Sequence, residues 1–231
     1  MKRQMPAYDE VAEAYSHTLD PDGAGLADPV LSGLIGEIAG QDVLSLACGQ
    51  GQDARLLASL GATVAGVDIS EEMLRHARRH EAAEPRGIVY VQGDVEDLAA
   101  FAGASFDGVL CHMALMDVSD LGATIRSVAR VLKAGGWFVF SIVHPCYHPH
   151  VAILADYLLD HRYRKQRPVD WLPPHAQHRP LGAYLNELAE AGLLIERVVE
   201  EHTAGRPQDA GGVPGLLYAR AGRCEARAPK S

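Results

Sequence analysis

Residues 43–70 read VLSLACGQGQDARLLASLGATVAGVDIS, and their pattern indicates the fold class of the chain. The stretch opens with an apolar run typical of a buried strand, turns at Gly49 and Gly51, and continues with the spacing of an amphipathic helix. A second apolar run then ends in Asp68. This order of strand, glycine turn, helix, strand and acid predicts a βαβ unit of a parallel α/β sheet, an arrangement that binds adenosine-containing cofactors.

The glycine turn has the chemistry that such a cofactor needs. Gly49, Gly51 and Ala54 match the pattern GxGxxA, in which glycines let the backbone turn sharply and approach a ligand closely. A helix beginning near Gln52 would present unpaired N–H groups, and Asp68 is placed to accept hydrogen bonds from ribose hydroxyls. A tight strand-to-helix turn can carry the same glycines without any ligand, so the motif needs support from the rest of the chain.

Short apolar runs alternate with helical patterns along the chain, which is typical of a mainly parallel sheet covered on both faces. The clearest helical spacing falls within 121–132, and a later helix is expected at 181–191, closed by Gly192. Gly135 and Gly136 are expected at the junction between a helix and a strand. The expected strands are 42–47, 63–67, 88–92, 106–111, 137–143, 194–200 and 215–221.

Length and composition favour a single domain over residues 1–231, since 48% of the residues are hydrophobic and a full core can form. Residues 1–40 are predicted to form an N-terminal helical lid. The segment 144–179 is rich in His, Pro, Tyr, Arg and Trp and is too long for a simple connection. We interpret it as an insertion with a short helix near 151–159.

Charge and cysteine content narrow the class of partner. A net charge of −9 argues against a protein that grips nucleic acid or an anionic membrane, because both need positive surface. The four cysteines form no CxxC pair, which indicates free thiols of a reducing compartment. No leader and no apolar run of about 20 residues is visible, so we expect a cytoplasmic protein without a membrane span that binds a small molecule.

The residues after the third strand help to distinguish two classes of cofactor that both bind to a glycine turn of this kind. Dinucleotides and S-adenosylmethionine both fit a GxGxxA turn followed by an acid. After the third strand the chain continues with Gly93, Asp94 and Val95, which sets a second acid beside a strand end. An acceptor there can meet an adenine amino group, and this favours S-adenosylmethionine.

With these motifs the chain resembles the class I S-adenosylmethionine-dependent methyltransferases, in particular bacterial ones that act on small molecules. The resemblance implies a Rossmann-like three-layer α/β sandwich with a seven-stranded, mostly parallel sheet and an antiparallel last strand. It implies methyl transfer to an O, N or C atom of a small-molecule acceptor in biosynthesis, with S-adenosylhomocysteine as product. The stretches that carry it are YDEVAEAY (8–15), VLSLACGQG (43–51), VDIS (67–70), GDVEDL (93–98), FDGVLCHMAL (106–115) and VARVLKAGGWFVFS (128–141).

The resemblance also implies roles for individual residues. Gly49 and Gly51 would face the methionine part of the cofactor, Asp68 the ribose and Asp94 the adenine, while Tyr15 would close over it. The backbone after Cys111 would hold the methionine amino group. The implied cofactor-binding residues are Tyr15, Ala47, Cys48, Gly49, Gly51, Asp68, Ile69, Met73, Gly93, Asp94, Val95, Cys111 and His112.

Two positions depart from the family pattern. Ser45 stands where an acid is usual, and Ala47 stands where a first glycine is common. The missing acid removes one contact with the cofactor or with its surroundings. The turn itself is retained, because Gly49 and Gly51 are present.

Methyl transfer needs a base only when the attacking atom carries a proton. Reacting groups gather at the carboxyl ends of strands in α/β sheets, which selects His112 and His144. His144 is the first candidate for a general base and His178 the second, because a neutral imidazole suits the task. The alternatives are that His144 only orients a loop, and that His178 and Arg179 only mark the entrance of a helix. His112 is expected to shape the acceptor pocket, or to contribute its backbone alone.

The acceptor pocket is expected to form from the insertion and from the loop after the fourth strand. Tyr147 and Trp171 offer flat apolar walls, and Arg179 is a further candidate for acceptor binding. The cations that could meet an acidic group on the acceptor, or alternatively form a solvated turn, are Arg162, Arg164, Lys165 and Arg167. Met113 and Met116 suit a pocket wall but equally a core. The insertion also offers a surface for association between copies of the chain.

Three further alternatives remain at this point. An NAD-dependent oxidoreductase would use the same turn and Asp68, and a non-catalytic regulator would bind S-adenosylmethionine without turning it over. An RNA substrate is disfavoured because no extended basic stripe is present. No metal is expected. Four possible metal ligands stand at every second position, and this spacing matches no common zinc pattern: His144, Cys146, His148 and His150.

Overall fold

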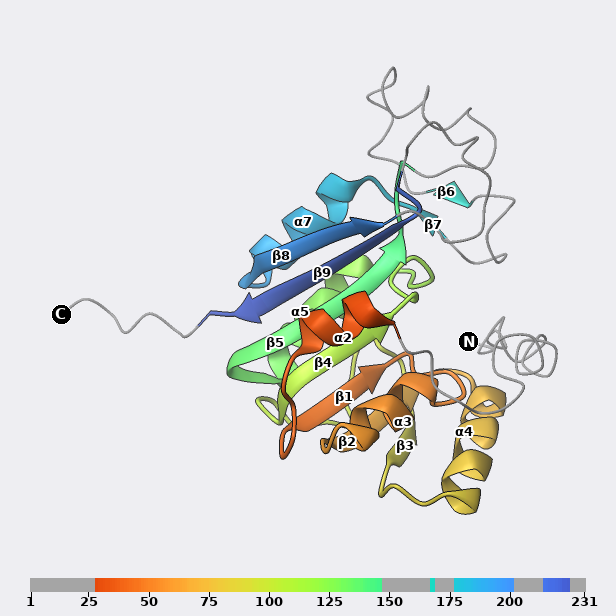
Figure 1. The fold of residues 1–231 in the computed structure, drawn as a ribbon. Coiled ribbons are helices and arrows are strands. Elements are labelled where there is room, and N and C mark those ends of the chain that lie inside the picture. Colours follow the sequence, from red (N-terminus) through yellow and green to blue (C-terminus); the bar gives the residue numbers. More distant parts are fainter. Residues whose placement is uncertain (1–27, 147–166, 169–176, 202–213, 225–231) are drawn as a thin grey trace.

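A seven-stranded sheet runs through the computed structural model, which describes residues 28–146, 167–168, 177–201 and 214–224 (Figure 1). The strand order is β3-β2-β1-β4-β5-β9-β8. Neighbours from β3 to β5 are parallel, and β9 pairs antiparallel with both β5 and β8. The sheet strands are β1 (Asp42–Leu46), β2 (Thr63–Asp68), β3 (Val89–Gln92), β4 (Phe106–His112), β5 (Leu132–Val143), β8 (Leu193–Glu201) and β9 (Leu216–Arg223).

The predicted fold class is therefore confirmed, including the antiparallel last strand. All seven expected strands are present, with ends that shift by a residue or two except at the start of β5. A separate antiparallel pair consists of β6 (Arg167–Pro168) and β7 (Gln177–His178). The helix expected near 151–159 lies outside the described residues.

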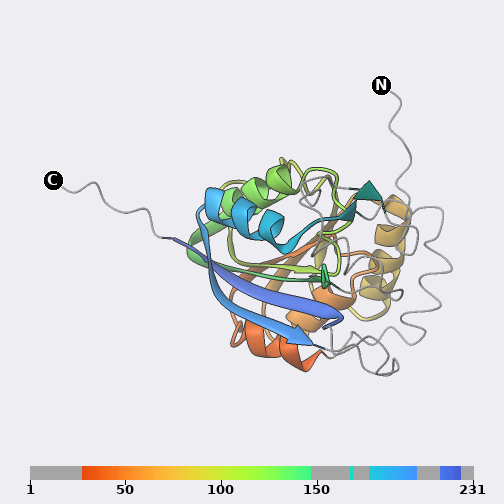
Figure 2. The ribbon, with the colours of Figure 1, turned by 90° about the horizontal axis from the view of Figure 1, so that it is seen from above.

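Helices cover both faces of the sheet. Figure 2 shows α5 and α7 on one face and α2 on the other. Short polar side chains begin three of the helices, because Asp28, Ser70 and Asp120 accept hydrogen bonds from free N–H groups of α2, α4 and α5. The described helices are α2 (Pro29–Ile35), α3 (Gln52–Ser59), α4 (Glu71–Ala83), α5 (Leu121–Val131) and α7 (Leu181–Glu190).

Two apolar clusters fill the spaces between the layers. One joins α5 and α7 to the sheet and includes Ile125, Leu188 and Phe138. The other joins α2 and α3 to the opposite face and includes Leu57 and Val139. Successive residues of β5 thus enter different clusters, as expected for a strand that is buried on both faces.

The start of β5 differs from the prediction. Gly135 and Gly136 lie inside the strand rather than at the junction after α5. The pairing of β4 with β5 shifts here, because Phe106 is opposite Leu132 whereas Gly108 is opposite Trp137. Gly135 has a φ of 75°, a left-handed conformation that glycine adopts without strain. The two glycines therefore form an irregularity within one long strand.

The strand order places a topological switch point between β1 and β4. The chain builds outward from β1 through β2 to β3 and then returns to the other side of β1 with β4. Loops that follow β1 and β4 therefore diverge at the carboxyl ends of these strands, and ligands of open α/β sheets bind in the crevice formed there. No helix in the described ranges is both long and apolar enough to cross a bilayer.

Candidate active site

The glycine turn joins the end of β1 to α3. Gly49 has a φ of 53° and Gly51 a φ of 85°, and Gly51 is the N-cap residue of α3. The Gly51 N–H donates to the carbonyl of Cys48 at 2.8 Å. The hydroxyl of Tyr90, from β3, occupies the place that a Cβ on residue 51 would take. Glycine is thus required at position 51 both by backbone conformation and by space.

Ala47 adopts a left-handed conformation at the end of β1. Its φ is 50° although it carries a Cβ, and this is the position at which the family commonly has glycine. A left-handed residue with a Cβ costs about 1–2 kcal/mol. Glycine would remove this strain and lose about 0.4–1 kcal/mol through its greater freedom in the unfolded chain.

We therefore expect Ala47→Gly to raise the free energy of unfolding by about 0.5–1 kcal/mol. Urea unfolding of both proteins, followed by circular dichroism, measures the difference. A variant with lower stability than the parent would contradict the strain at Ala47.

Asp68 ties the turn to the end of β2. Its Oδ2 accepts a hydrogen bond from the Gly49 N–H at 2.7 Å, and its Oδ1 accepts one from the Ser70 N–H at 2.9 Å. The side chain is buried. An ionised carboxylate is an acceptor with two oxygens, which is the chemistry that the hydroxyls of a ribose require. The predicted ribose contact is compatible with this geometry.

The loops after β2 and β3 lie together beside this carboxylate. The Gly93 N–H donates to the carbonyl of Asp68 at 2.9 Å, and Asp94 accepts from the Glu96 N–H at 2.9 Å through Oδ1. Asp94 is exposed, and Ile69 is an apolar side chain with 48% of its surface exposed. An exposed apolar residue beside an exposed acid can pack on an adenine ring and accept from its amino group.

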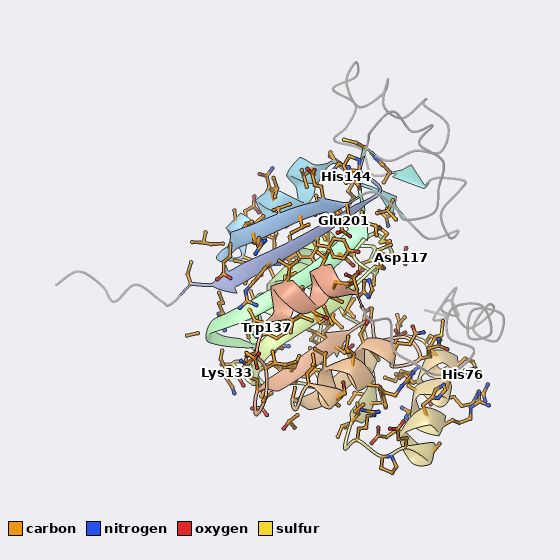
Figure 3. All side chains as sticks on the ribbon, viewed as in Figure 1. His76, Asp117, Lys133, Trp137, His144 and Glu201 are labelled. Atoms are coloured by element: carbon orange, nitrogen blue, oxygen red, sulfur yellow. The ribbon has the colours of Figure 1, made fainter. Side chains whose placement is uncertain are left out.

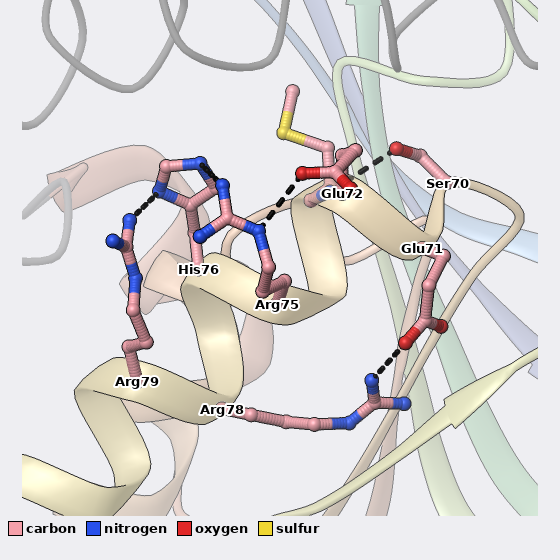
Figure 4. Close-up of polar contacts among 8 residues, drawn as sticks. Ser70, Glu71, Glu72, Arg75, His76, Arg78 and Arg79 are labelled. Atoms are coloured by element: carbon pink, nitrogen blue, oxygen red, sulfur yellow. Dashed lines mark hydrogen bonds and ion pairs between the residues drawn. The ribbon is translucent and has the colours of Figure 1, made fainter.

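The first turn of α4 fixes the segment that follows Asp68 (Figure 4). The Ser70 hydroxyl accepts from the N–H of Met73 at 3.1 Å. The buried His76 lies between two guanidinium groups, with Arg79 at 2.5 Å from Nδ1 and Arg75 at 3.3 Å from Nε2. Met73 is itself buried, so its predicted cofactor contact stays a prediction.

Gln50, between the two glycines, has a buried polar side chain whose surroundings suggest a bound ligand. It is 2% exposed, and within the described part of the chain neither Oε1 nor Nε2 has a hydrogen-bond partner. A buried polar group without a partner costs about 1–3 kcal/mol. Polar atoms of a cofactor held at the turn would supply these hydrogen bonds, so the residues present fit such a group.

We predict that Gln50→Leu raises the melting temperature of the ligand-free protein, because an unsatisfied amide is replaced by an apolar side chain of similar size. The same change should weaken cofactor binding about 10-fold, the loss expected for one or two hydrogen bonds. Differential scanning fluorimetry with and without cofactor measures both effects. A lower melting temperature without ligand, together with unchanged affinity, would contradict this role.

A histidine and an aspartate meet at the switch point between β1 and β4. His112 is the last residue of β4 and Asp53 lies in the first turn of α3. The Nδ1 atom of His112 is 3.2 Å from Oδ2 and 3.3 Å from Oδ1 of Asp53. Both side chains are largely buried. Burial lowers the pKa of His112, but the hydrogen bond and charge of Asp53, with the charge of Asp28, raise it above 6.5 overall.

Comparison with known proteins identifies the family. A family model described as a methyltransferase domain matches residues 44–140. The crystal structure of an S-adenosylmethionine-dependent methyltransferase from Mesorhizobium loti is similar with a TM-score of 0.70 and 32% identity, over 84% of this chain and 96% of that chain. The chain belongs to the S-adenosylmethionine-dependent methyltransferases. The predicted family and cofactor are thereby confirmed.

Curated relatives of this methyltransferase are named ubiquinone biosynthesis O-methyltransferase. The one from Thiobacillus denitrificans is 38% identical over 46% of this chain and 46% of its own length. The one from Chromobacterium violaceum is 33% identical over 63% of this chain and 66% of its own length. The chain thus matches about half to two thirds of the length of these relatives. None of these comparisons supports an NAD-dependent oxidoreductase.

The fit of S-adenosylmethionine to this methyltransferase rests on the turn, Asp68 and Gln50. When bound, the cofactor supplies a methyl group already activated on a sulfonium sulfur. The backbone at Gly49 and Gly51 can approach it closely, and the acid of Asp68 faces the same loop. Val95 is buried, and so are Cys48 and Cys111. Their predicted cofactor contacts, and that of Ala47, remain predictions.

His144 has structural partners on both ring nitrogens. Figure 3 shows His144 and Lys133 at opposite ends of β5. The His144 Nε2 is 2.8 Å from Oε1 of Glu200, and Nδ1 accepts from the Cys146 N–H at 3.1 Å. The imidazole is 5% exposed. Its role as general base stays a prediction, and the geometry favours the alternative that it orients the chain after β5.

The other predicted acceptor residues have different surroundings. The Nε2 of His178 bonds the carbonyl of Pro145 at 2.9 Å. Arg179 is 1% exposed and donates to backbone carbonyls of the loop after β4, among them Leu115 at 3.1 Å. Met116 is part of the core. These contacts favour structural roles for Arg179 and Met116. They give no support to the prediction that either residue binds the methyl-accepting substrate.

Several predicted residues lie outside the described residues: Tyr15, Tyr147, Arg162, Arg164, Lys165 and Trp171. Met113 lies at the carboxyl end of β4 with a φ of 55°, which is strained for a long side chain. Its N–H donates to the hydroxyl of Ser141 at 3.0 Å. Backbone strain at a strand end is typical of functional loops, so a place for Met113 in the pocket remains a prediction.

Sequence reasoning missed Asp53 and the side chain of Gln50. Asp53 lies four residues after Gly49, in the first turn of a helix, where an acid is commonly interpreted as a helix-stabilising charge. The signal that could have found it is the switch point, because β1 and β4 must be neighbours to bring Asp53 to His112.

In the described part of the chain no group of three His, Cys, Asp or Glu side chains is arranged to hold a metal ion.

Proposed function

We propose that this methyltransferase transfers the methyl group of S-adenosylmethionine to an oxygen atom of a small-molecule acceptor in a biosynthetic pathway. The observation that carries the proposal is the Asp68 carboxylate, which joins the glycine turn to the start of α4 beside the switch point. The choice of oxygen is supported by the name of the curated relatives, ubiquinone biosynthesis O-methyltransferase. Nitrogen and carbon acceptors lack comparable support.

The acceptor pocket is proposed to form from residues 1–40 and 144–179 over the carboxyl ends of the strands. One contact supports this placement: the Gln177 N–H donates to the carbonyl of Met116 at 2.8 Å. Segment 177–179 therefore lies against the loop after β4. Arg179 strengthens the same junction through its buried guanidinium.

The proposed partner is a small molecule, and the proposed location is the cytoplasm. A net charge of −9 opposes binding to nucleic acid, because phosphate contacts need positive surface. The cysteines are free thiols, two of them buried, as is usual in a reducing compartment.

The experiment that tests this function uses S-adenosylmethionine with a labelled methyl group and a panel of phenols, catechols and aliphatic alcohols. We expect label in at least one acceptor, with one S-adenosylhomocysteine formed for each methyl transferred. Label that stays in the cofactor with every acceptor, although the cofactor binds, would contradict the enzyme and favour the non-catalytic regulator.

A further inference from the structure

We propose that His112, oriented by Asp53, accepts the proton of the acceptor hydroxyl during methyl transfer. This inference rests on the proposed function, since a base is needed only when the attacking oxygen carries a proton. The pair is positioned at the switch point, where the chain leaves β1 and β4 in different directions. The distances of 3.2 Å and 3.3 Å from Nδ1 to the two oxygens of Asp53 are hydrogen-bond distances.

The carboxylate fixes which ring nitrogen carries the proton. An ionised aspartate offers only acceptors, so Nδ1 of His112 must be the donor. In the neutral ring the lone pair is then on Nε2. Within the residues that the structure describes, Nε2 has no hydrogen-bond partner. A neutral imidazole with a bound Nδ1–H and a free Nε2 lone pair is the form of histidine that acts as a base.

The sheet register holds the imidazole on the face covered by α2 and α3. His112 is opposite Ser141 of β5, which is opposite Tyr218 of β9. Residues in register on neighbouring strands point to the same face. Tyr218 packs in the cluster formed with α2 and α3, and its hydroxyl donates to Asp28 at 2.7 Å. The glycine turn leads directly into α3, so the pair adjoins the loop assigned to the cofactor.

The charges around His112 favour a proton on the ring after transfer. Among the described residues, the charged groups that act on it are Asp53 from α3 and Asp28 at the start of α2. Both are acids, and both raise the pKa of the imidazole. An imidazolium formed in the reaction would therefore be stabilised where it forms.

The other two candidate histidines lack this combination. Both ring nitrogens of His144 are engaged, by Glu200 and by the Cys146 N–H. The Nε2 of His178 is bound to a backbone carbonyl. Of the three histidines, only His112 is paired with a largely buried carboxylate of helix α3 while its Nε2 has no partner among the described residues.

The step balances without any further reactant. The acceptor oxygen forms a bond to the methyl carbon while the bond from that carbon to sulfur breaks, and the bonding electron pair stays on sulfur. The hydroxyl proton passes to Nε2 of His112. The products are a methyl ether, S-adenosylhomocysteine and an imidazolium paired with Asp53, which returns its proton to water.

The test compares His112→Asn with the parent enzyme on two probes, catechol and 4-nitrocatechol. Asparagine can still donate from Nδ2 to Asp53, but it has no basic nitrogen. The nitro group makes one hydroxyl ionise near neutral pH, so this probe needs little help from a base. We expect His112→Asn to lower kcat for catechol about 100-fold or more. Transfer to 4-nitrocatechol should fall much less, and the Kd of S-adenosylmethionine should stay within about 2-fold.

The pH profile gives a second readout that a merely structural role would not move. The unprotonated ring is the base, so kcat for catechol should rise with pH through the pKa of His112, above its ordinary value of 6.5. Asp53→Asn removes the charge that raises this pKa, and the rise should move to lower pH. His80→Asn, in the last turn of α4, is the matched control and should leave rate and profile unchanged.

Four outcomes would overturn the proposal. Equal losses on both probes, or a Kd for S-adenosylmethionine weakened 10-fold or more, would assign His112 to structure or to cofactor binding. An unchanged catechol rate would remove it as the base while leaving the methyltransferase function in place. A parent enzyme that transfers no methyl group to any hydroxyl would overturn the proposed function and this proposal together.

Discussion

Asp68→Ala is expected to weaken the binding of S-adenosylmethionine about 100-fold or more. A hydrogen bond to a charged group contributes about 1.5–3 kcal/mol, and 100-fold in affinity corresponds to about 2.7 kcal/mol. Alanine removes the oxygens proposed to accept from the ribose, together with the hydrogen bonds from the Gly49 N–H at 2.7 Å and the Ser70 N–H at 2.9 Å. The turn would then lose its link to β2. Calorimetric titration of parent and variant measures the change.

Two further variants serve as controls for Asp68→Ala. Asp68→Asn keeps one carbonyl acceptor and should lose less affinity than alanine. Asp97→Ala removes an acid from the loop after β3 and should leave the Kd unchanged. If Asp68→Ala bound S-adenosylmethionine as tightly as the parent, the assigned position of the ribose would be wrong.

Gly51→Ala is expected to lower the free energy of unfolding by about 2–4 kcal/mol and to abolish cofactor binding. The left-handed backbone, with a φ of 85°, costs about 1–2 kcal/mol for a residue with a Cβ. The Tyr90 hydroxyl fills the place of that Cβ, and overpacking of this kind costs about 1–3 kcal/mol. Relief of the clash would move the turn that is proposed to face the methionine part of the cofactor. Urea unfolding and titration measure the two effects.

The two causes can be separated by matched variants. Gly192 has a φ of 75°, and no heavy atom lies within 4 Å of the place that a Cβ on this residue would take. Gly192→Ala should therefore show the backbone cost alone. Tyr90→Phe removes the hydroxyl and should recover part of the stability lost in Gly51→Ala. A double variant no more stable than Gly51→Ala would contradict the clash with Tyr90.

The central strands β1, β4 and β5 could be predicted from the sequence because they are largely buried on both faces. Such strands are apolar runs, and they are visible without knowledge of the partners. The start of β5 could not be predicted in this way. Gly135 and Gly136 have the composition of a turn, and only the pairing of Leu132 with Phe106 extends the strand before them.

The candidate site also contains residues that are close in the sequence, which could be predicted, and contacts between distant residues, which could not. Gly49, Gly51 and Asp68 belong to one βαβ unit, so local order along the chain was sufficient to predict that they lie together. The His112–Asp53 contact joins residues 59 positions apart, and the contact between His144 and Glu200 joins residues 56 positions apart. Whether a histidine is open or engaged depends on these long-range partners. Sequence reasoning therefore selected His144, whereas the contacts favour His112.

The most direct measurement of cofactor choice is a calorimetric titration of the protein with S-adenosylmethionine, S-adenosylhomocysteine and NADH under the same conditions. We predict that the first two bind at one site with micromolar affinity, that Asp68→Ala weakens both by about 100-fold or more, and that NADH gives no heat of binding. Binding of NADH, with no binding of S-adenosylmethionine, would contradict the assignment of the glycine turn and Asp68 to S-adenosylmethionine.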